Sequence, residues 1–152
     1  MIKDKLDILH ATNQEREWAA SILSASDPWI TLGRTFDHCL KTCNDPEYQI
    51  FVGHLNNVPV GFFILDPRGL AGSPYIKSIA IADEFRNRNF GAELLKYAED
   101  IARKNSANMF LCVSSFNSRA QSFYENHGYH IVGELKDYII KGASEIIMHK
   151  SL

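Results

Sequence analysis

Cysteine is scarce in this sequence. The 152 residues include 3 cysteines, Cys39, Cys43 and Cys112, and so small and odd a number argues against a framework of disulfide bonds. Cys39 and Cys43 are four residues apart with His38 beside them, but no second ligand pair follows at the spacing of a metal site. We therefore expect neither disulfides nor a bound metal.

Long apolar runs and an excess of charge of one sign are also lacking. No apolar run approaches the length needed to span a bilayer, and charges interrupt the opening segment 1–7, where a secretory signal would need an apolar core. The formal net charge of −2 gives no general attraction for nucleic acid. The sequence thus favours a cytoplasmic protein that binds neither membranes nor nucleic acid, and any site for a polyanion must be local.

Linkers and nucleotide-binding glycine motifs are missing as well. No segment rich in proline, glycine or serine divides the chain, and no internal repeat is present, so we expect a single domain over residues 1–152. The glycines form neither the Gly-x-Gly-x-x-Gly turn of dinucleotide-binding proteins nor a Gly-Lys-Ser/Thr phosphate loop. Both of these nucleotide-binding classes are excluded.

The hydrophobic pattern predicts an α+β fold with a mixed sheet, because strands and helices alternate in the middle of the chain and strands predominate toward its ends. Asn13 is the expected cap of the first helix, and the segments 66–69 and 72–74 are expected to break the chain before the next strand. Trp29 and Phe36, seven residues apart, are expected to share one buried helical face. The expected helices span residues 13–23, 29–39, 90–104 and 118–127, and the expected strands span 6–10, 48–54, 58–65, 75–82, 108–113, 129–135 and 144–150.

The most informative segment is an apolar strand, residues 75–82, followed by a basic turn and an amphipathic helix. The first amides of a helix have no intrahelical partner and carry partial positive charge, so they can bind a phosphate. Arg86 and Arg88 add fixed charge beside those amides. Asn89 tolerates the left-handed backbone that such a turn requires. The segment therefore indicates a binding site for an anion.

A second motif, residues 117–129, follows the apolar strand at 108–113. Asn117 or Ser118 can cap a helix here, residues Ala120, Phe123 and Tyr124 recur at helical spacing, and Gly128 ends the helix.

Together the two motifs resemble the GNAT superfamily of acyl-CoA-dependent N-acyltransferases. The family loop Gln/Arg-x-x-Gly-x-Gly/Ala corresponds to residues 86–91, with Asn89 in place of the first glycine, and residues 117–129 resemble its Asn-x-x-Ala-x-x-Phe-Tyr-Glu-x-x-Gly-Phe/Tyr segment. The resemblance covers roughly residues 48–150 and is closest in motif to N-terminal acetyltransferases of the ribosomal-protein-alanine type. It implies a mixed, mostly antiparallel sheet of six to seven strands flanked by about four helices, splayed between the strands near 75–82 and 108–113.

The resemblance also implies acetyl-CoA as co-substrate and assigns residues to it. The backbone of the strand would pair with the pantetheine arm, the loop would hold the pyrophosphate, and Asn117 would hydrogen-bond near the pantetheine. Tyr124 would donate a proton to the leaving thiolate, which a phenol can do because the thiolate is comparably basic. The implied cofactor residues are Ile79, Ala80, Ile81, Arg86, Asn87, Arg88, Asn89, Phe90, Gly91, Ala92, Asn117 and Tyr124.

The group that deprotonates the amine is less evident. Cys112 stands where related enzymes carry a glutamate or a histidine, and a cysteine on an apolar strand is typically a small buried residue. Tyr75, at the start of the cofactor strand, is the candidate base, acting through ordered water. No activated nucleophile of the Ser-His or Cys-His kind is evident, so we expect direct transfer of the acetyl group.

The acceptor side is expected across the sheet from the cofactor. Its candidate residues are Trp29, Leu32, Arg34, Phe36, His38 and Tyr138. The tail from Asp137 to Met148 partly resembles the segment that lines the peptide groove of N-terminal acetyltransferases, so the acceptor is either a polypeptide N-terminus or a small-molecule amine. The alternative function is a non-catalytic acyl-CoA-binding sensor, and the fold is also compatible with a homodimer.

Overall fold

The computed structural model describes residues 4–152; residues 1–3 of the charged opening segment lie outside the described part. A seven-stranded sheet has the order β1-β2-β3-β4-β5-β7-β6, and every pair is antiparallel except β4 with β5. The strands are β1 (Asp7–His10), β2 (Gln49–Leu55), β3 (Val58–Leu70), β4 (Ser73–Ile81), β5 (Asn108–Ser114), β6 (His130–Lys136) and β7 (Ser144–Ser151). The helices are α1 (Asn13–Ser24), α2 (Phe36–Cys43), α3 (Phe90–Arg103) and α4 (Ser118–Asn126), with a short 3₁₀ turn η1 (Asp83–Phe85).

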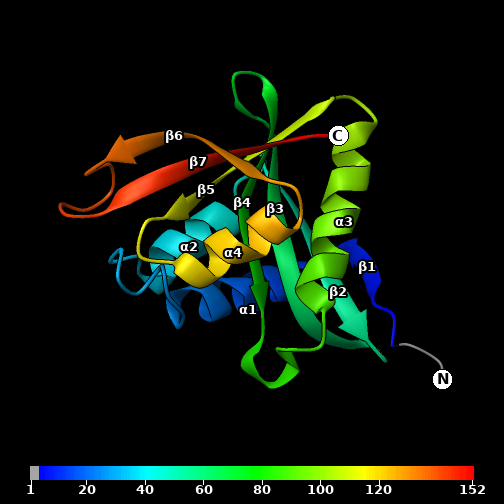
Figure 1. Ribbon diagram of the computed structural model, residues 1–152. Helices are drawn as coiled ribbons and strands as arrows, with labels where there is room; N and C mark the ends of the chain where they lie inside the picture. Colours follow the sequence, from blue (N-terminus) through cyan, green and yellow to red (C-terminus); the bar gives the residue numbers. More distant parts are fainter. Residues whose placement is uncertain (1–3) are drawn as a thin grey trace.

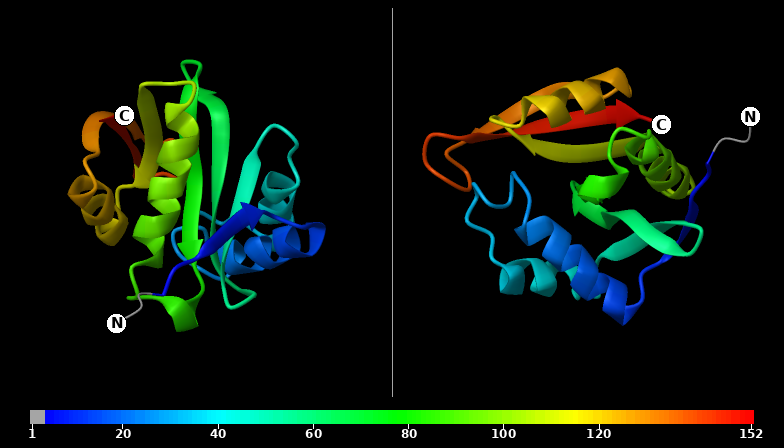
Figure 2. Two further views of the ribbon diagram at one scale, coloured as in Figure 1. Left: turned by 90° about the vertical axis from the view of Figure 1, so that its right-hand side faces the viewer. Right: turned by 90° about the horizontal axis from the view of Figure 1, so that it is seen from below.

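Helices cover both faces of the sheet and create two apolar cores (Figures 1 and 2). One core packs α3 and α4 against strand residues such as Phe63, Leu111 and Met148. The other packs α1 and α2 against residues such as Phe62 and Ile64 of β3. Alternate side chains of a strand point to opposite faces, and the sheet is therefore the middle layer of three. The predicted α+β class, the mixed sheet and its four helices are confirmed.

β4 and β5 diverge, as the resemblance implies. They pair only at Tyr75 with Phe110 and at Ile76 with Leu111. Just beyond, Ser78 pairs with Ile64 of β3, whereas Ile76 pairs with the next residue, Leu65, so Lys77 is an extra residue in β4. Such a bulge bends and twists the strand that carries it. The bend accounts for the separation of β4 from β5 beyond Ile76, and that separation leaves one edge of β4 open.

The second predicted helix is displaced. Residues 29–33 form turns instead of a helix, and α2 begins only at Phe36. Gly33 has φ +72°, which a continuous helix cannot contain, and the Thr35 hydroxyl then caps α2 by accepting a hydrogen bond from the His38 amide at 3.2 Å. The prediction that Trp29 and Phe36 share a helical face is therefore wrong, since Trp29 precedes the helix and Phe36 is 42% exposed.

Two other predicted boundaries also change. Thr12, not Asn13, caps α1: its hydroxyl accepts from the Glu15 amide at 3.1 Å, and the Glu15 carboxylate accepts from the Thr12 amide at 3.0 Å. β3 does not end before 66–69 but continues through an irregular register to Leu70, and the turn falls at Ala71 and Gly72. Pro67 has no amide hydrogen to donate to a neighbouring strand. It is tolerated in this part of β3 because the pairing with β4 is interrupted there.

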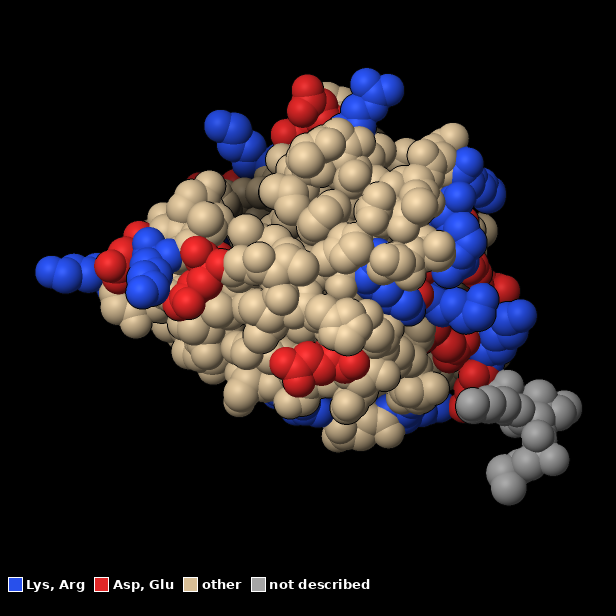
Figure 3. All heavy atoms as spheres, turned by 45° about the horizontal axis from the view of Figure 1, so that its top comes forward, with Lys and Arg blue, Asp and Glu red and all other residues tan. Residues whose placement is uncertain are grey.

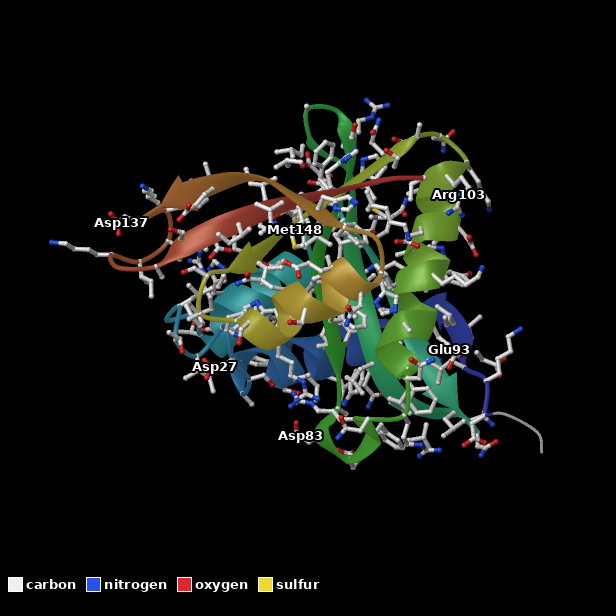
Figure 4. The ribbon with its side chains drawn as sticks, viewed as in Figure 1. Asp27, Asp83, Glu93, Arg103, Asp137 and Met148 are labelled. Atoms are coloured by element: carbon white, nitrogen blue, oxygen red, sulfur yellow. The ribbon has the colours of Figure 1, made fainter. Side chains whose placement is uncertain are left out.

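Surface contacts fix the outer elements. Glu93 on α3 accepts a hydrogen bond from the Leu6 amide at 3.3 Å and so ties the N-terminal segment to α3 (Figure 4).

Charged side chains of both signs gather over α3 and at the tip of the β6–β7 hairpin, whereas the area between them is mostly uncharged (Figure 3). None of the helices in the described part of the chain has the length and apolar character to cross a membrane.

Candidate active site

The open edge of β4 presents backbone groups that are not paired with another strand. In an antiparallel pair, successive residues point their backbone groups alternately toward and away from the partner strand. The Ala82 amide donates to the Val60 carbonyl of β3 at 2.9 Å, so the backbone groups of Ile79 and Ile81 point to the open side. In agreement, the Ile81 carbonyl accepts a hydrogen bond from Arg86 Nε at 3.3 Å. The backbone of Ala80 is paired with β3, and only its side chain lies near the open edge.

The turn before α3 exposes the first amides of that helix. Asn87 and Asn89 both have a left-handed backbone, with φ of +64° and +67°. Within residues 4–152, no side chain caps the helix, and its first internal hydrogen bond joins the Glu93 amide to the Asn89 carbonyl at 3.4 Å. The amides of Phe90, Gly91 and Ala92 therefore have no partner within the helix and are available to an anion. The prediction that Asn89 takes the left-handed conformation is confirmed.

These elements line a cavity of about 400 Å³, called here the loop cavity. It is bordered by the open edge of β4, the turn before α3, the start of α4 and the segment after α1. A Cβ at Gly91 would contact only the Phe123 ring of the cavity lining, at an ordinary distance of 3.6 Å. The cavity has the donors, the charge and the room that a phosphate-bearing chain requires.

The arginines of this cavity are not the expected pair. Arg86 and Arg119 line it, and the Arg119 guanidinium donates to Asn87 Oδ1 at 3.1 Å. The Arg88 side chain instead forms an ion pair with Asp4 at 2.6 Å and lies over the Phe90 ring, outside the cavity lining. Sequence reasoning missed Arg119, because only the packing of α4 beside the turn brings it there.

A second cavity, of about 240 Å³, lies on the sheet face that carries α1 and α2 and is called here the sheet cavity. The two cavities meet at the gap between β4 and β5. They share six lining residues: Pro28, Trp29, Ile79, Asn117, Ala120 and Tyr124. A group bound in one cavity can therefore lie beside a group bound in the other.

Asn117 and Tyr124 are placed at this junction by α4. Asn117 caps the helix, since its Oδ1 accepts from the Ala120 amide at 3.2 Å, which leaves the amide donors of its side chain free to face the cavities. Tyr124 is 8% exposed and packs edge-on against Tyr129. Burial raises the pKa of the Tyr124 hydroxyl above its ordinary value near 10, so the phenol holds its proton at neutral pH.

The wall of the sheet cavity carries a carboxylate that the sequence reasoning had not assigned. Glu145 of β7 lies opposite Ser114 of β5, is 9% exposed, and accepts a hydrogen bond from the Ser114 hydroxyl at 2.7 Å. No sequence signal revealed this pairing, because it depends on the register of two distant strands. Tyr75 and Cys112 line the same cavity.

Tyr75 and Cys112 both retain their protons. Burial, and next the adjacent Cys112 thiol, raise the pKa of Tyr75 well above its ordinary value. Burial also raises the pKa of Cys112. A neutral thiol is a poor nucleophile, and a neutral phenol is a poor base, so among these three groups Glu145 is the natural proton acceptor.

Most predicted acceptor residues reach the sheet cavity. Trp29, Leu32, Arg34 and His38 line it, from the segment after α1 and from α2. Phe36 and Tyr138 do not line it; Tyr138, 67% exposed, lies in the β6–β7 connection next to Asp137 at the hairpin tip (Figure 4), and Ile139 lines the wall instead. In Figure 1 and the right view of Figure 2, the α1–α2 segment approaches this connection, so the two close the cavity from opposite sides.

Within residues 4–152, no group of three or more His, Cys, Asp or Glu side chains is arranged to hold a metal ion. Cys39 and Cys43 are instead buried in the apolar core beneath α1 and α2.

An open strand edge, unpaired amides at a helix start and a buried tyrosine between two cavities suit a group-transfer enzyme with a phosphate-bearing co-substrate. The chain belongs to the acetyltransferase (GNAT) family, whose sequence profile matches residues 11–129. It is therefore an acyltransferase. A comparison with curated protein sequences finds no match.

Solved structures share this fold. A GNAT-family protein from Desulfovibrio desulfuricans is 15% identical, with a TM-score of 0.83, over 97% of this chain and 99% of that one. A GNAT-family acetyltransferase from Elizabethkingia anophelis with acetyl-CoA bound is 21% identical, with a TM-score of 0.75, over 99% and 100%. An aminoglycoside 6'-N-acetyltransferase complexed with coenzyme A is 17% identical, with a TM-score of 0.77, over 95% and 96%. At these identities the likeness establishes the fold alone.

Proposed function

We propose that this protein transfers an acetyl group from acetyl-CoA directly to a primary amine. The observation that carries the proposal is the meeting of the two cavities at Tyr124, with anion-binding groups on one side and a buried carboxylate on the other. The loop cavity takes the cofactor and the sheet cavity takes the amine.

The residues of the loop cavity suit coenzyme A. The amides of residues 90–92, together with Arg86 and Arg119, offer donors and positive charge to the pyrophosphate. The pantetheine arm, which carries amide groups, can pair with the backbone of Ile79 and Ile81 as an added strand. Arg88 contributes through its backbone position in the turn, since its side chain is held by Asp4.

The chemistry requires two proton movements. As the nitrogen–carbon bond forms, the amine loses a proton, and Glu145 is placed to receive it. As the carbon–sulfur bond breaks, the thiolate needs a proton, and the neutral Tyr124 hydroxyl is placed to donate it. Tyr75 stays a predicted catalytic residue, but its raised pKa favours hydrogen bonding to the amine or to a water molecule over proton abstraction.

Direct transfer is preferred over an acetyl-enzyme, because the raised pKa of Cys112 keeps the thiol in the cavity neutral. The alternative of a non-catalytic acyl-CoA sensor rested on the missing acid at Cys112. Glu145 supplies a carboxylate in the same cavity, so no structural feature now favours a sensor over an enzyme.

The test combines binding with turnover. Saturating acetyl-CoA should raise the unfolding temperature by about 5–10 °C, since ligand at about 100 times Kd stabilises a native protein by about 2.7 kcal/mol. A panel of primary amines should then release free thiol from acetyl-CoA. A thermal shift without thiol release from any amine would refute the enzyme and leave the sensor, and the absence of a shift would refute both.

A further inference from the structure

The sheet cavity carries charges of both signs, on different walls. The acid is Glu145, buried at the β5–β7 wall beside Ser114. The cations Arg34 and Lys77, with His38, come from the segment before α2, from the bulge of β4 and from α2. A ligand that fills this cavity therefore meets a carboxylate at one side and a basic cluster at another.

The basic residues line one cavity, and among the described residues Arg34 has no ion-pair partner. Burial, followed by the charges of Arg34, Lys41 and Lys77, lowers the pKa of His38, which is the effect expected of cations gathered around the imidazole. Lys77 lies over the Tyr48 ring, with Nζ at 4.7 Å from its centroid. Arg34 is half-buried, and in the described part of the chain it forms no ion pair. A half-buried guanidinium that lines a cavity without an acidic partner is suited to bind an anion from outside the chain.

The cavity is also small. Its volume of about 240 Å³ lies below the range of about 300–1,000 Å³ typical of sites for drug-sized ligands. An acceptor that fits entirely inside it has roughly the size of an amino acid.

We propose that the acceptor is a small zwitterion: a primary amine, held at Glu145 and Ser114, that also carries an anionic group bound by Arg34 with His38 and Lys77. Amino acids and aminoalkyl phosphonates belong to this class. The proposal rests on the proposed function, because it names the substrate of the same transferase site.

Charge argues against the other amine classes. Polyamines and aminoglycosides carry several positive charges, which the basic cluster repels and which a single carboxylate cannot neutralise. A peptide N-terminus brings a neutral amide beside its amine and leaves Arg34 without a partner. The acetyl transfer balances for this acceptor. The ammonium first loses a proton to Glu145, which passes it to solvent. The neutral amine nitrogen then bonds to the acetyl carbon as the carbon–sulfur bond breaks, Glu145 receives the second amine proton, and Tyr124 gives a proton to the thiolate and regains one from solvent.

The first experiment measures free thiol release by the full chain with amine pairs that differ in one anionic group. L-Leucine is compared with isoamylamine, and β-alanine and 2-aminoethylphosphonate with n-propylamine; spermidine, kanamycin and a neutral tetrapeptide amide complete the panel. In at least one pair the zwitterion should have a kcat/KM about 10- to 100-fold higher, the value of a hydrogen bond to a charged group. The proposal is overturned if the neutral members, the polycations or the peptide are acetylated as efficiently.

The second experiment assigns the preference to Arg34. Arg34→Gln should raise KM for the preferred zwitterion about tenfold with little change in kcat, and should affect its neutral counterpart much less, because only the anion loses a partner. Arg34→Lys should restore part of the affinity. Arg103→Gln, at the exposed end of α3 (Figure 4), is the matched control and should change neither constant.

An equal loss with both members of the pair would show that Arg34 merely supports the fold, and would refute the proposal; the unfolding temperature of each variant identifies that case. The two hypotheses fail differently. Thiol release that is faster with neutral amines than with zwitterions refutes the proposed acceptor alone. A thermal shift by acetyl-CoA without thiol release from any amine refutes both the proposed transfer reaction and the proposed acceptor.

Discussion

The Glu145 carboxylate lies directly across the strand pair from Ser114 and accepts its hydroxyl hydrogen bond at 2.7 Å. Because both residues are buried at the wall of the sheet cavity, this bond fixes the orientation of the carboxylate at the site proposed for the acceptor amine. Under the proposed mechanism a proton acceptor is needed near the amine, and Glu145 on β7 is the carboxylate that lines the same cavity as Cys112 of β5.

Glu145→Gln should therefore lower kcat/KM by about 10²–10⁴-fold, the range typical of a lost general base. The acetyl-CoA thermal shift should stay unchanged, since Glu145 does not line the loop cavity. Ser114→Ala is the companion variant and should cost less, because it frees the carboxylate without removing it. Turnover of the glutamine variant within about threefold of the parent would exclude Glu145 as the base and return that role to Tyr75.

Tyr124→Phe should lower kcat by a similar factor of about 10²–10⁴ with nearly unchanged affinity for acetyl-CoA. The pH profile provides a second check. Because burial raises the pKa of Tyr124 above 10, the phenol remains protonated and kcat should not decline between pH 7 and 10 through loss of this donor. A decline that has its midpoint below pH 10 in the parent and is absent in Tyr124→Phe would contradict this environment for the hydroxyl.

The arginines in and beside the turn before α3 allow a comparison between side chains that line the loop cavity and one that does not. Arg119→Ala and Arg86→Ala should each reduce the thermal shift given by acetyl-CoA, because both guanidinium groups line the loop cavity. A lost contact to a phosphate corresponds to about 1.5–3 kcal/mol, or about a 10- to 100-fold rise in Kd. Arg88→Ala is the matched control: its side chain pairs with Asp4 on the surface, where such pairs contribute little, so the shift should persist. If Arg88→Ala loses acetyl-CoA binding and the other two variants keep it, Arg88 binds the phosphates in place of Arg86 and Arg119.

Asn89→Gly should preserve or slightly raise stability, because Asn89 has φ +67° and glycine adopts this conformation without steric cost. Asn89→Val should lower the free energy of unfolding by about 1–2 kcal/mol, the cost of a left-handed backbone for a residue with a bulky Cβ. Chemical denaturation measures both changes. Acetyl-CoA affinity should follow the same order, since the turn positions the amides of α3; equal affinities in the two variants would mean that the turn shape is unimportant for binding.

Sequence reasoning succeeded where neighbours along the chain decide the structure. The left-handed turn at Asn89, the Asn117 cap and the end of α4 before Gly128, which has φ +93°, each depend on residues within one or two helical turns. Errors arose where a readable local signal was overlooked. The Thr12–Glu15 capping box and Gly33 are both present in the sequence, so the predicted cap at Asn13 and the predicted helix start at Trp29 are wrong for local reasons.

The sequence by itself therefore determined the class of fold, the strand, turn and helix that expose the amides of α3, and the family, because these features are written in contiguous segments. Only the tertiary structure decided which charges face the cavities. Arg119 reaches Asn87 across 32 residues, and Glu145 reaches Ser114 across 31. Both contacts depend on how α4 packs and on the register of β5 with β7, and these are set by burial of the whole apolar core, which no short segment encodes.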